Sequence, residues 1–262
     1  MDFQDNILEL KNVSLHFGGL KAVNDVSFSM KSNEILSLIG PNGAGKTSTF
    51  NLITGVYTPT SGDVIYKGKR INNFKPYKIT QEGMARTFQN IRLFKQLTVL
   101  ENIILAMHNL RKIDLVRSVL SVPYYFKELA KVTKQAEEYL DYFGLIEHKN
   151  TRAENLPYGK QRELEICRAL ATGADVLLLD EPAAGMNPAE TEQLMITIKR
   201  IRNELSKGVF LIEHDMKLVM GISDRVVVLD YGSKIAEGKP EDIRNNRRVI
   251  DAYLGKEVEE NA

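Results

Sequence analysis

Three scarcities limit what this chain of 262 residues can be. It has one cysteine, Cys167, and no tryptophan, and its 35 basic and 34 acidic residues leave a formal net charge of +1. A single cysteine excludes an internal disulfide and fits a reducing compartment. Because Cys167 lies in a helical pattern, we expect a small buried residue rather than a reactive thiol. The near-zero charge gives no positive field that would argue for a nucleic-acid partner.

The chain also lacks a long apolar segment. No apolar run approaches the roughly 18 residues of a membrane-spanning helix. Residues 1–5 lack the basic and apolar regions of a secretory signal. We therefore expect any membrane association to depend on a partner. The chain does contain 43% hydrophobic and 26% charged residues, which is typical of a globular protein with a sizeable core.

The most informative motif is GPNGAGKT at residues 40–47, which matches the phosphate-binding pattern G-x-x-x-x-G-K-[ST] at every fixed position. An apolar run at residues 35–39 predicts a buried strand before it, and residues 47–54 predict a helix after it. Glycines let the backbone wrap around an anion, and the N–H groups of the loop and helix would point at a phosphate. Lys46 adds a mobile positive charge for the β- and γ-phosphates, and the Thr47 hydroxyl can ligate Mg²⁺. A glycine-rich turn without a ligand is the alternative, and the flanking strand and helix count against it.

Hydrophobic patterns predict an α/β fold around this loop. Alternating apolar residues at 13–17 and 26–30 predict two antiparallel strands, half-buried, before the loop. Continuous apolar runs at 176–179, 209–212 and 226–229 predict buried parallel strands. Because helical patterns separate these runs, we expect a parallel central sheet.

Residues 95–160 are predicted to form a helical insertion between these strand-rich parts. Residues 98–101 match a capping box, and apolar residues recur at helical spacing from 127 to 143. Residues 187–190 supply a similar start for a helix that runs to about residue 205. The basic and aromatic residues at 109–126 could form a binding surface, although an ordinary connection between helices is the simpler interpretation.

Polar residues follow two of the buried strands. Asp180 is expected to bind Mg²⁺, directly or through water, and Glu181 can deprotonate an attacking water, an effect worth about 10²–10⁴ in rate. A strand-end cap is the weaker alternative, because carboxylates there need a cation or hydrogen-bond partners. His214 ends another strand and could contact a γ-phosphate. Phe17, at a strand end, could stack on an adenine ring or simply pack within its sheet.

Taken in order along roughly residues 5–255, these motifs resemble those of the ATP-binding subunits of ABC transporters. The resemblance implies one ABC ATPase domain with a P-loop NTPase (RecA-like) α/β core, an N-terminal antiparallel β subdomain and a helical insertion subdomain. The implied bounds are 5–94 and 161–240 for the nucleotide-binding core with its β subdomain, 95–160 for the helical subdomain and 241–255 for a C-terminal helical segment.

The resemblance also implies a role for individual residues. Phe17 matches the adenine-stacking aromatic, Gln89 the glutamine that senses Mg²⁺ and the membrane partner, and Asp180 the Walker B aspartate. Glu181 matches the catalytic glutamate and His214 the switch histidine. The implied catalytic residues are Glu181, His214 and Lys46; the implied metal ligands are Thr47, Gln89 and Asp180; the implied nucleotide-binding residues are Phe17, Gly40, Pro41, Asn42, Gly43, Ala44, Gly45, Lys46, Thr47, Ser48, Gln89, Tyr158, Gly159 and Lys160.

Two loops depart from the family pattern. Residues 156–161 read LPYGKQ where L-S-G-G-Q is common, so Pro157 replaces the serine and has neither a hydroxyl nor an N–H group. The remaining phosphate donors would be the N–H groups of Tyr158, Gly159 and Lys160, aided by the helix N-terminus, and Lys160 would add charge. In the second loop, Asn187 replaces the usual D-loop aspartate.

Residues 85–94, 181–188 and 243–255 resemble one branch of the family, the LivG-type subunits of branched-chain amino-acid importers, and the long segment 107–126 also fits that branch. The resemblance implies ATP and Mg²⁺ as cofactors and a second ATPase subunit, identical or related. It further implies two transmembrane permeases, an extracytoplasmic solute-binding protein that acts indirectly, and a peripheral location on the cytoplasmic face of the cell membrane, with no nucleic acid.

Other members of the family remain alternatives. ATPases for urea or amide uptake and for lipopolysaccharide export share much of the pattern. A soluble ABC ATPase that acts on DNA or ribosomes is less favoured. Only about a hundred residues separate Thr47 from Leu156, which leaves no room for a long coiled coil, and the chain holds one ATPase unit where translation-type proteins hold two.

Overall fold

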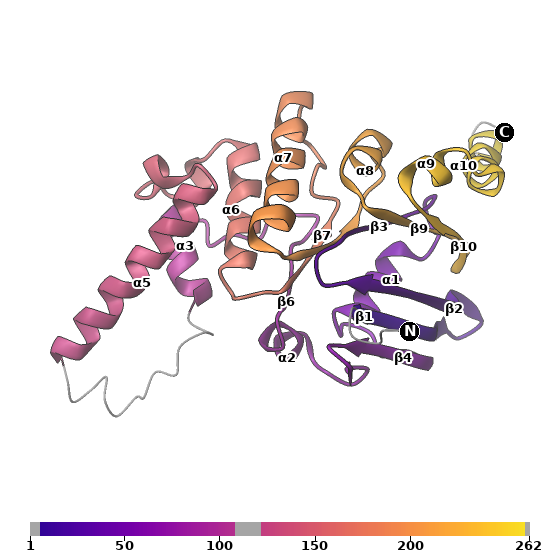
Figure 1. Ribbon diagram of the computed structural model, residues 1–262, viewed down its shortest axis with the longest axis horizontal. Coiled ribbons are helices and arrows are strands. Elements are labelled where there is room, and N and C mark those ends of the chain that lie inside the picture. The colour runs from indigo at the N-terminus through magenta and orange to yellow at the C-terminus, as the bar shows by residue number, and fades with distance from the viewer. Residues whose placement is uncertain (1–5, 108–121, 260–262) are drawn as a thin grey trace. The chain divides into compact units, whose positions relative to one another are not determined.

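Two stretches of the chain, residues 6–107 and 122–259, are described by the computed structural model (Figure 1). The chain divides into two compact units. The first combines Met1–Arg86 with Asp175–Ala262, and the second is Thr87–Ala174. The first unit is therefore built from segments far apart in the sequence, and the second unit is inserted between them.

An antiparallel sheet opens the first unit. Its strands are β1 (Asn6–Phe17), β2 (Leu20–Lys31), β4 (Ser61–Tyr66) and β5 (Lys69–Arg70), in the order β2-β1-β4-β5. Strands β1 and β2 form a hairpin in which Phe17 pairs with Leu20. The antiparallel strands predicted from the alternating pattern are thus confirmed.

A six-stranded sheet forms the centre of the same unit, in the order β10-β9-β3-β8-β7-β6. Every residue of β3, β7 and β8 is buried, which is why these strands read as continuous apolar runs. The strands from β9 to β6 are parallel, and β10 pairs antiparallel with β9 at one edge. The predicted parallel central sheet is confirmed. The six strands are β3 (Ile35–Ile39), β6 (Met84–Arg86), β7 (Val176–Asp180), β8 (Gly208–Ile212), β9 (Arg225–Asp230) and β10 (Ser233–Gly238).

The first unit also contains helices whose ends follow local sequence signals. Helix α7 begins after a capping box in which the Asn187 side chain accepts from the Glu190 N–H and the Glu190 side chain accepts from the Asn187 N–H, both at 3.0 Å. Two short helices escaped prediction, because six or seven residues are too few to show a helical period. They are α2 (Pro76–Gln81) and α8 (Met216–Ile222); the others are α1 (Lys46–Ile53), α7 (Pro188–Leu205), α9 (Pro240–Arg244) and α10 (Arg247–Glu259).

One buried cluster joins the two sheets of the first unit. The rings of Phe28 on β2 and Phe210 on β8 are stacked with their centroids 5.9 Å apart, and Phe50 on α1 lies 6.1 Å from Phe210. Since α1 follows the glycine-rich loop directly, this packing holds the base of the loop against both sheets.

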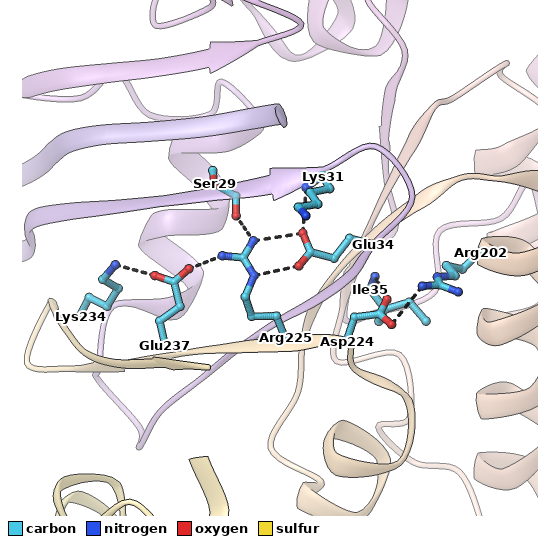
Figure 2. A network of polar contacts seen from close by, with 9 residues as sticks. All are labelled: Ser29, Lys31, Glu34, Ile35, Arg202, Asp224, Arg225, Lys234 and Glu237. Atoms are coloured by element: carbon cyan, nitrogen blue, oxygen red, sulfur yellow. Dashed lines mark hydrogen bonds and ion pairs between the residues drawn. The ribbon is translucent and has the colours of Figure 1, made fainter. Parts of the chain in front are cut away.

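A polar network links the sheets near their edge (Figure 2). The Arg225 guanidinium at the start of β9 donates to both carboxylate oxygens of Glu34, at 2.8 and 3.1 Å, and it also contacts Glu237 on β10 and the Ser29 carbonyl on β2. Glu34 in turn accepts from the Lys31 N–H at 2.8 Å. The hydrogen bonds to Glu34 raise the pKa of Arg225.

The second unit is helical in the part that the structure describes. Helix α3 begins after the predicted capping box, where Thr98 Oγ1 accepts from the Glu101 N–H at 3.2 Å and the Glu101 carboxylate accepts from the Thr98 N–H at 2.7 Å. Cys167 is buried, as predicted, and burial raises the pKa of its thiol well above the usual value. The helical elements are α3 (Val99–Ala106), α5 (Val122–Tyr142), the short 3₁₀ helices Ile146–His148 and Ala153–Asn155, and α6 (Tyr158–Leu170).

The second unit extends beyond residues 95–160 at both ends. The reason is that α6 packs against α3 and α5, while residues 88–94 are held by side chains of α6 and α3. Residues 108–121, which make up most of the basic and aromatic segment noted above, lie outside the described residues. Within residues 6–107 and 122–259, no helix has the length and hydrophobicity needed to cross a membrane.

Candidate functional site

The glycine-rich loop connects β3 to α1 at the centre of the parallel sheet. Gly40 has a φ angle of +150°, and a Cβ atom there would lie 2.1 Å from the Leu229 carbonyl oxygen. Gly45 has a φ angle of +96°, and its Cβ would lie 2.5 Å from the Ala22 carbonyl oxygen. Neither position has space for a side chain, so packing alone requires the fixed glycines of the motif.

Lys46 carries a buried positive charge within this loop. Its side chain is only 8% exposed, and its ammonium group donates to the carbonyl oxygens of Gly40 at 2.7 Å and Pro41 at 3.0 Å. Thr47 and Ser48 follow in the first turn of α1, where helix N–H groups have no intrahelical partner. The lysine, the helix N-terminus and the loop N–H groups together form a site suited to an anion.

A cavity of about 690 Å³ elsewhere in this unit is mostly apolar, whereas the cavity at the loop, of about 510 Å³, is lined by polar groups as well. The loop cavity brings together several of the predicted residues. It is lined by Asn42, Gly43, Ala44, Gly45, Lys46, Thr47, Ser48 and Glu181, together with Leu20, Lys21, Ala22 and Tyr231.

The β9–β10 turn forms one side of the cavity, which the sequence did not predict. Tyr231, which is 70% exposed, lies in the β9–β10 turn, and the next residue, Gly232, donates its N–H to the Ala44 carbonyl oxygen at 3.0 Å. The Gly232 carbonyl oxygen accepts from the Asn24 N–H of β2 at 2.8 Å. In the sequence these residues are visible only as a turn, because nothing local places them beside a loop almost two hundred residues away.

Asp180, at the end of β7, is 7% exposed and forms an ion pair with Arg86 at 2.9 Å. The Arg86 guanidinium also donates to Asn51 at 2.9 Å and Thr54 at 3.2 Å, and it lies 4.6 Å from the centre of the Phe50 ring. The cation that a buried strand-end carboxylate requires is therefore supplied by β6. Sequence reasoning gave Arg86 no role.

Glu181 and His214 lie beside each other at the ends of neighbouring strands. The Glu181 carboxylate lies 3.8 Å from Nδ1 of His214, whose side chain is 65% exposed. Glu181 adopts a left-handed backbone conformation with φ of +45°, and its N–H donates to the Ile212 carbonyl oxygen at 2.9 Å. A non-glycine residue in this region is uncommon and often marks a functional site. A carboxylate beside an imidazole can accept a proton from water and orient that water.

The oxygen donors present fit a magnesium–nucleotide complex. Thr47 supplies a hydroxyl and Asp180 a carboxylate, and the described residues contain no group of three or more His, Cys, Asp or Glu side chains that could hold a metal. Mg²⁺ is commonly bound by one or two protein oxygens together with substrate phosphates and water, so a sparse protein donor set suits it. Gln89, the third predicted ligand, belongs to the second unit, where it is exposed.

Within the second unit, the predicted signature residues start helix α6. Pro157 is its N-cap residue, and Tyr158, Gly159 and Lys160 form its first turn, where N–H groups can bind an anion. The Tyr158 side chain is 42% exposed. The Lys160 ammonium pairs with Glu163 at 2.8 Å, so part of the charge expected from Lys160 is neutralised within its own helix.

A buried arginine connects this helix to the segment that contains Gln89. Arg162 is fully buried, donates to the carbonyl oxygens of Phe88 at 2.8 Å and Gln89 at 2.9 Å, and pairs with Glu165 at 2.8 Å. Sequence reasoning missed Arg162, because an arginine in a helical pattern is usually exposed.

Phe17 lies at the end of β1, and its side chain is 46% exposed. One edge of the ring meets Tyr57 in a T-shaped contact with centroids 5.3 Å apart. Phe17, Asp180 and His214 do not line the loop cavity itself. The stacking role of Phe17 therefore stays a prediction.

Comparison with known proteins identifies relatives along almost the whole chain. The family described as "ABC transporter" matches residues 23–184, and the family described as "Branched-chain amino acid ATP-binding cassette transporter" matches residues 233–259. The high-affinity branched-chain amino acid transport ATP-binding protein LivG of Escherichia coli (strain K12) is 46% identical over 95% of this chain and 98% of its own length. BraF of Pseudomonas aeruginosa, with the same description, is 44% identical over the same shares.

Solved structures similar to this chain are also ATP-binding cassettes. The crystal structure of the ADP conformation of an ATP-binding cassette of an ABC transporter has a TM-score of 0.82 and 29% identity, covering 95% of this chain and 99% of its own. A dimeric cassette in a post-hydrolysis state, bound to ADP and Pi, has a TM-score of 0.73 and 26% identity, covering 89% of this chain and 98% of its own.

Proposed function

Since the chain belongs to the ABC transporter family as an ATP-binding protein and ATPase, we propose that it powers an importer of branched-chain amino acids. The single observation that supports this cargo best is the 46% identity to LivG over 95% of the chain. The C-terminal match at residues 233–259 favours the same branch over urea, amide or lipopolysaccharide transport. We also propose that residues 5–255 form one ABC ATPase domain, with a C-terminal helical segment at 241–255.

In this proposal the loop cavity binds the phosphates of ATP. The loop N–H groups and Lys46 bind the β- and γ-phosphates, and Phe17 stacks on the adenine. Thr47, Asp180 and Gln89 would hold Mg²⁺, which supplies charge neutralisation at the phosphates when it is bound. Ion-pairing to Arg86 holds the Asp180 carboxylate in a defined orientation at the end of β7.

Hydrolysis would depend on the pair at the strand ends. Glu181 accepts a proton from the attacking water, and His214, whose exposed imidazole lies beside it, orients the γ-phosphate. The electrostatic contribution comes from Lys46 and the helix N-terminus, which stabilise negative charge as the terminal phosphate leaves.

In a dimer of ATPase subunits there would be two ATP-binding sites, and each chain would supply one half of each site. The first turn of α6, with Tyr158, Gly159 and Lys160, would close over the γ-phosphate bound to a second ATPase subunit, identical or related. ATP then stabilises the dimer by hydrogen bonds to a charged group, each worth roughly 1.5–3 kcal/mol. Loss of the γ-phosphate separates the subunits. The ATPase subunits lie on the cytoplasmic face of the membrane and transmit this movement to two transmembrane permeases. An extracytoplasmic solute-binding protein delivers the solute to the permeases.

The first prediction tests the role of Glu181. The Glu181→Gln variant should bind ATP and form a stable dimer while hydrolysing ATP at least 100-fold more slowly, because a neutral amide cannot accept the proton from water. Size-exclusion chromatography with and without Mg-ATP measures the dimer, and phosphate release measures turnover. Hydrolysis at the wild-type rate would remove Glu181 from the catalytic role.

The cargo is tested with the complete transporter. The ATPase should co-purify with the two permeases encoded with it and, in proteoliposomes that also receive the binding protein, should drive ATP-dependent uptake of leucine, isoleucine and valine. A transporter assembled with the Glu181→Gln subunit is the control without hydrolysis. Uptake of urea or an amide in place of these amino acids would overturn the cargo assignment but leave the ATPase assignment intact.

A further inference from the structure

A second glutamate, Glu213, precedes His214 in the chain and contacts the loop that follows Glu181. Glu213 follows β8 and precedes His214, and it is only 1% exposed. Its Oε1 atom accepts from the Ala183 N–H at 2.9 Å. Its Oε2 atom accepts from the N–H groups of His214 at 3.0 Å and Asp215 at 3.3 Å. One carboxylate thus binds backbone from two different loops.

The two loops are those that carry the proposed catalytic pair. Ala183 lies in the turn that begins at Glu181, where the backbone is left-handed, and this turn is closed by a hydrogen bond from the Ala184 N–H to the Glu181 carbonyl oxygen at 3.1 Å. On the other side, Glu213 Oε2 lies 3.9 Å from Nδ1 of His214, and the Glu181 carboxylate lies 3.8 Å from the same nitrogen. The position of Glu181 relative to His214 therefore depends on a carboxylate that holds both of their loops.

Burial of the Glu213 carboxylate costs free energy that its hydrogen bonds must offset. Burial raises the pKa of Glu213, and the hydrogen bonds from Ala183, Asp215 and His214 only partly offset this. The advantage of a carboxylate is that both oxygens accept hydrogen bonds and neither donates. A glutamine in either orientation would turn its NH₂ group toward backbone N–H groups and would break the link on one side.

We propose that Glu213 is a positioning residue for ATP hydrolysis, which fixes the Glu181 loop and the His214 loop in one relative position. This proposal rests on the function proposed above. It assigns Glu213 no contact with the nucleotide. Its role is to hold the Glu181 carboxylate and the His214 imidazole at the separation that the reaction needs, since a displacement of about 1 Å can reduce a rate by about 10²-fold.

The experiment compares two buried glutamates. Glu213→Gln should lower kcat for ATP by about 10- to 100-fold while the KM and the affinity for a fluorescent ATP analogue change less than about twofold. The control is Glu34→Gln: Glu34 is 6% exposed and is held by the Lys31 N–H and by Arg225, away from the loop cavity. We expect Glu34→Gln to lower the melting temperature without lowering kcat at 25 °C.

A double-mutant cycle with His214→Ala provides a readout that a merely structural role would not affect. If Glu213 acts by aligning His214 with Glu181, Glu213→Gln should reduce kcat by less than about threefold when His214 is already absent. Fully additive losses in kcat, unchanged turnover of the single variant, or a loss confined to nucleotide affinity would each overturn the proposal. Where Glu213→Gln does not fold, Glu213→Asp is used, because it keeps the charge but is one methylene too short to reach both loops.

The outcome can be separated from failure of the proposed function. If the wild-type protein, with its permeases and Mg-ATP, does not hydrolyse ATP, the proposed function fails and the positioning role, which rests on it, is overturned as well. If the wild type is active and the Glu213 and Glu34 variants behave alike, the proposed function stands and the positioning role is rejected.

Discussion

Two buried charged residues, Lys46 and Asp180, and the groups that hold them make up much of the candidate site. Lys46 is 8% exposed and Asp180 is 7% exposed, and each is held by partners at 2.7 to 3.0 Å. Burial of a charge is costly unless hydrogen bonds and opposite charges compensate for it. The partners of these two residues are therefore part of the site, and variants of the partners should have measurable effects.

The importance of the buried lysine can be measured by nucleotide binding. Lys46→Ala removes the only side-chain ammonium within the 40–47 loop and should weaken ATP binding at least tenfold, because a charge-assisted contact to phosphate is worth roughly 1.5–3 kcal/mol. Lys199→Ala, at an exposed position on α7, is the matched control and should bind like the wild type. Equal ATP affinity of the Lys46 variant and the wild type would contradict the assignment of the loop.

The Arg86–Asp180 pair can be tested through stability. Arg86→Met leaves the Asp180 carboxylate without its guanidinium partner and should lower the free energy of unfolding by about 3 kcal/mol, since loss of one partner of a buried pair leaves an uncompensated charge. The double variant Arg86→Met/Asp180→Asn should recover part of that loss. Denaturant unfolding of the wild type, the two single variants Arg86→Met and Asp180→Asn, and the double variant gives the coupling energy. A coupling near zero would show that Arg86 does not stabilise Asp180.

At the scale of secondary structure, helix starts coincide with the predicted binding loops. Helix α1 begins at Lys46, α6 begins at Tyr158, and α7 begins at Pro188 directly after the segment that contains Glu181. The first turn of a helix has free N–H groups and a partial positive charge. These starts are consequently the places where local sequence signals coincide with the proposed ligand-binding residues.

The cap of α7 provides the element-scale prediction. Asn187→Ala removes the side chain that accepts from the Glu190 N–H and should lower the free energy of unfolding by about 1 kcal/mol. Asn187→Asp should keep the cap, because a carboxylate accepts the same hydrogen bond and interacts favourably with the helix N-terminus. Urea unfolding of the three proteins tests this. Equal stability of the alanine variant and the wild type would show that the cap contributes nothing.

At the scale of the whole first unit, two sheets must act as one support for the loop. Their shared core includes Phe28, Phe50 and Phe210, and the Arg225 network joins β2, β9 and β10 at the edge (Figure 2). Because α1 packs within this core, the core holds the glycine-rich loop in place, whereas the edge network adds stability away from the loop cavity.

The edge network can be tested by heat. Arg225→Met should lower the free energy of unfolding by about 2 kcal/mol, because the buried Glu34 loses its partner, and should lower the melting temperature by about 4–8 °C. Arg200→Met is the control: its pair with Glu204 on α7 is exposed and should contribute less than about 1 kcal/mol. Similar melting temperatures for the two variants would show that the network stabilises the fold no more than an exposed ion pair does.

The sequence by itself determined the glycine-rich loop, the parallel strands around it and the caps of α3 and α7. These features depend on residues close together in the chain: a fixed glycine spacing, continuous apolar runs, and a side chain that caps a helix three residues on. The same local signals placed Asp180, Glu181 and His214 at strand ends, and the strand order confirms that β7 and β8 are neighbours.

Only the tertiary structure decided which side chains support that site. Arg86 and Asp180 are 94 positions apart in sequence, and Ala183 and Glu213 are 30 apart. These pairs meet because β6, β7 and β8 are adjacent in the sheet, and strand adjacency is a property of the folded chain that no local pattern carries. Tyr231 reaches the loop for the same reason, since the pairing of β9 with β3 brings the β9–β10 turn against Ala44.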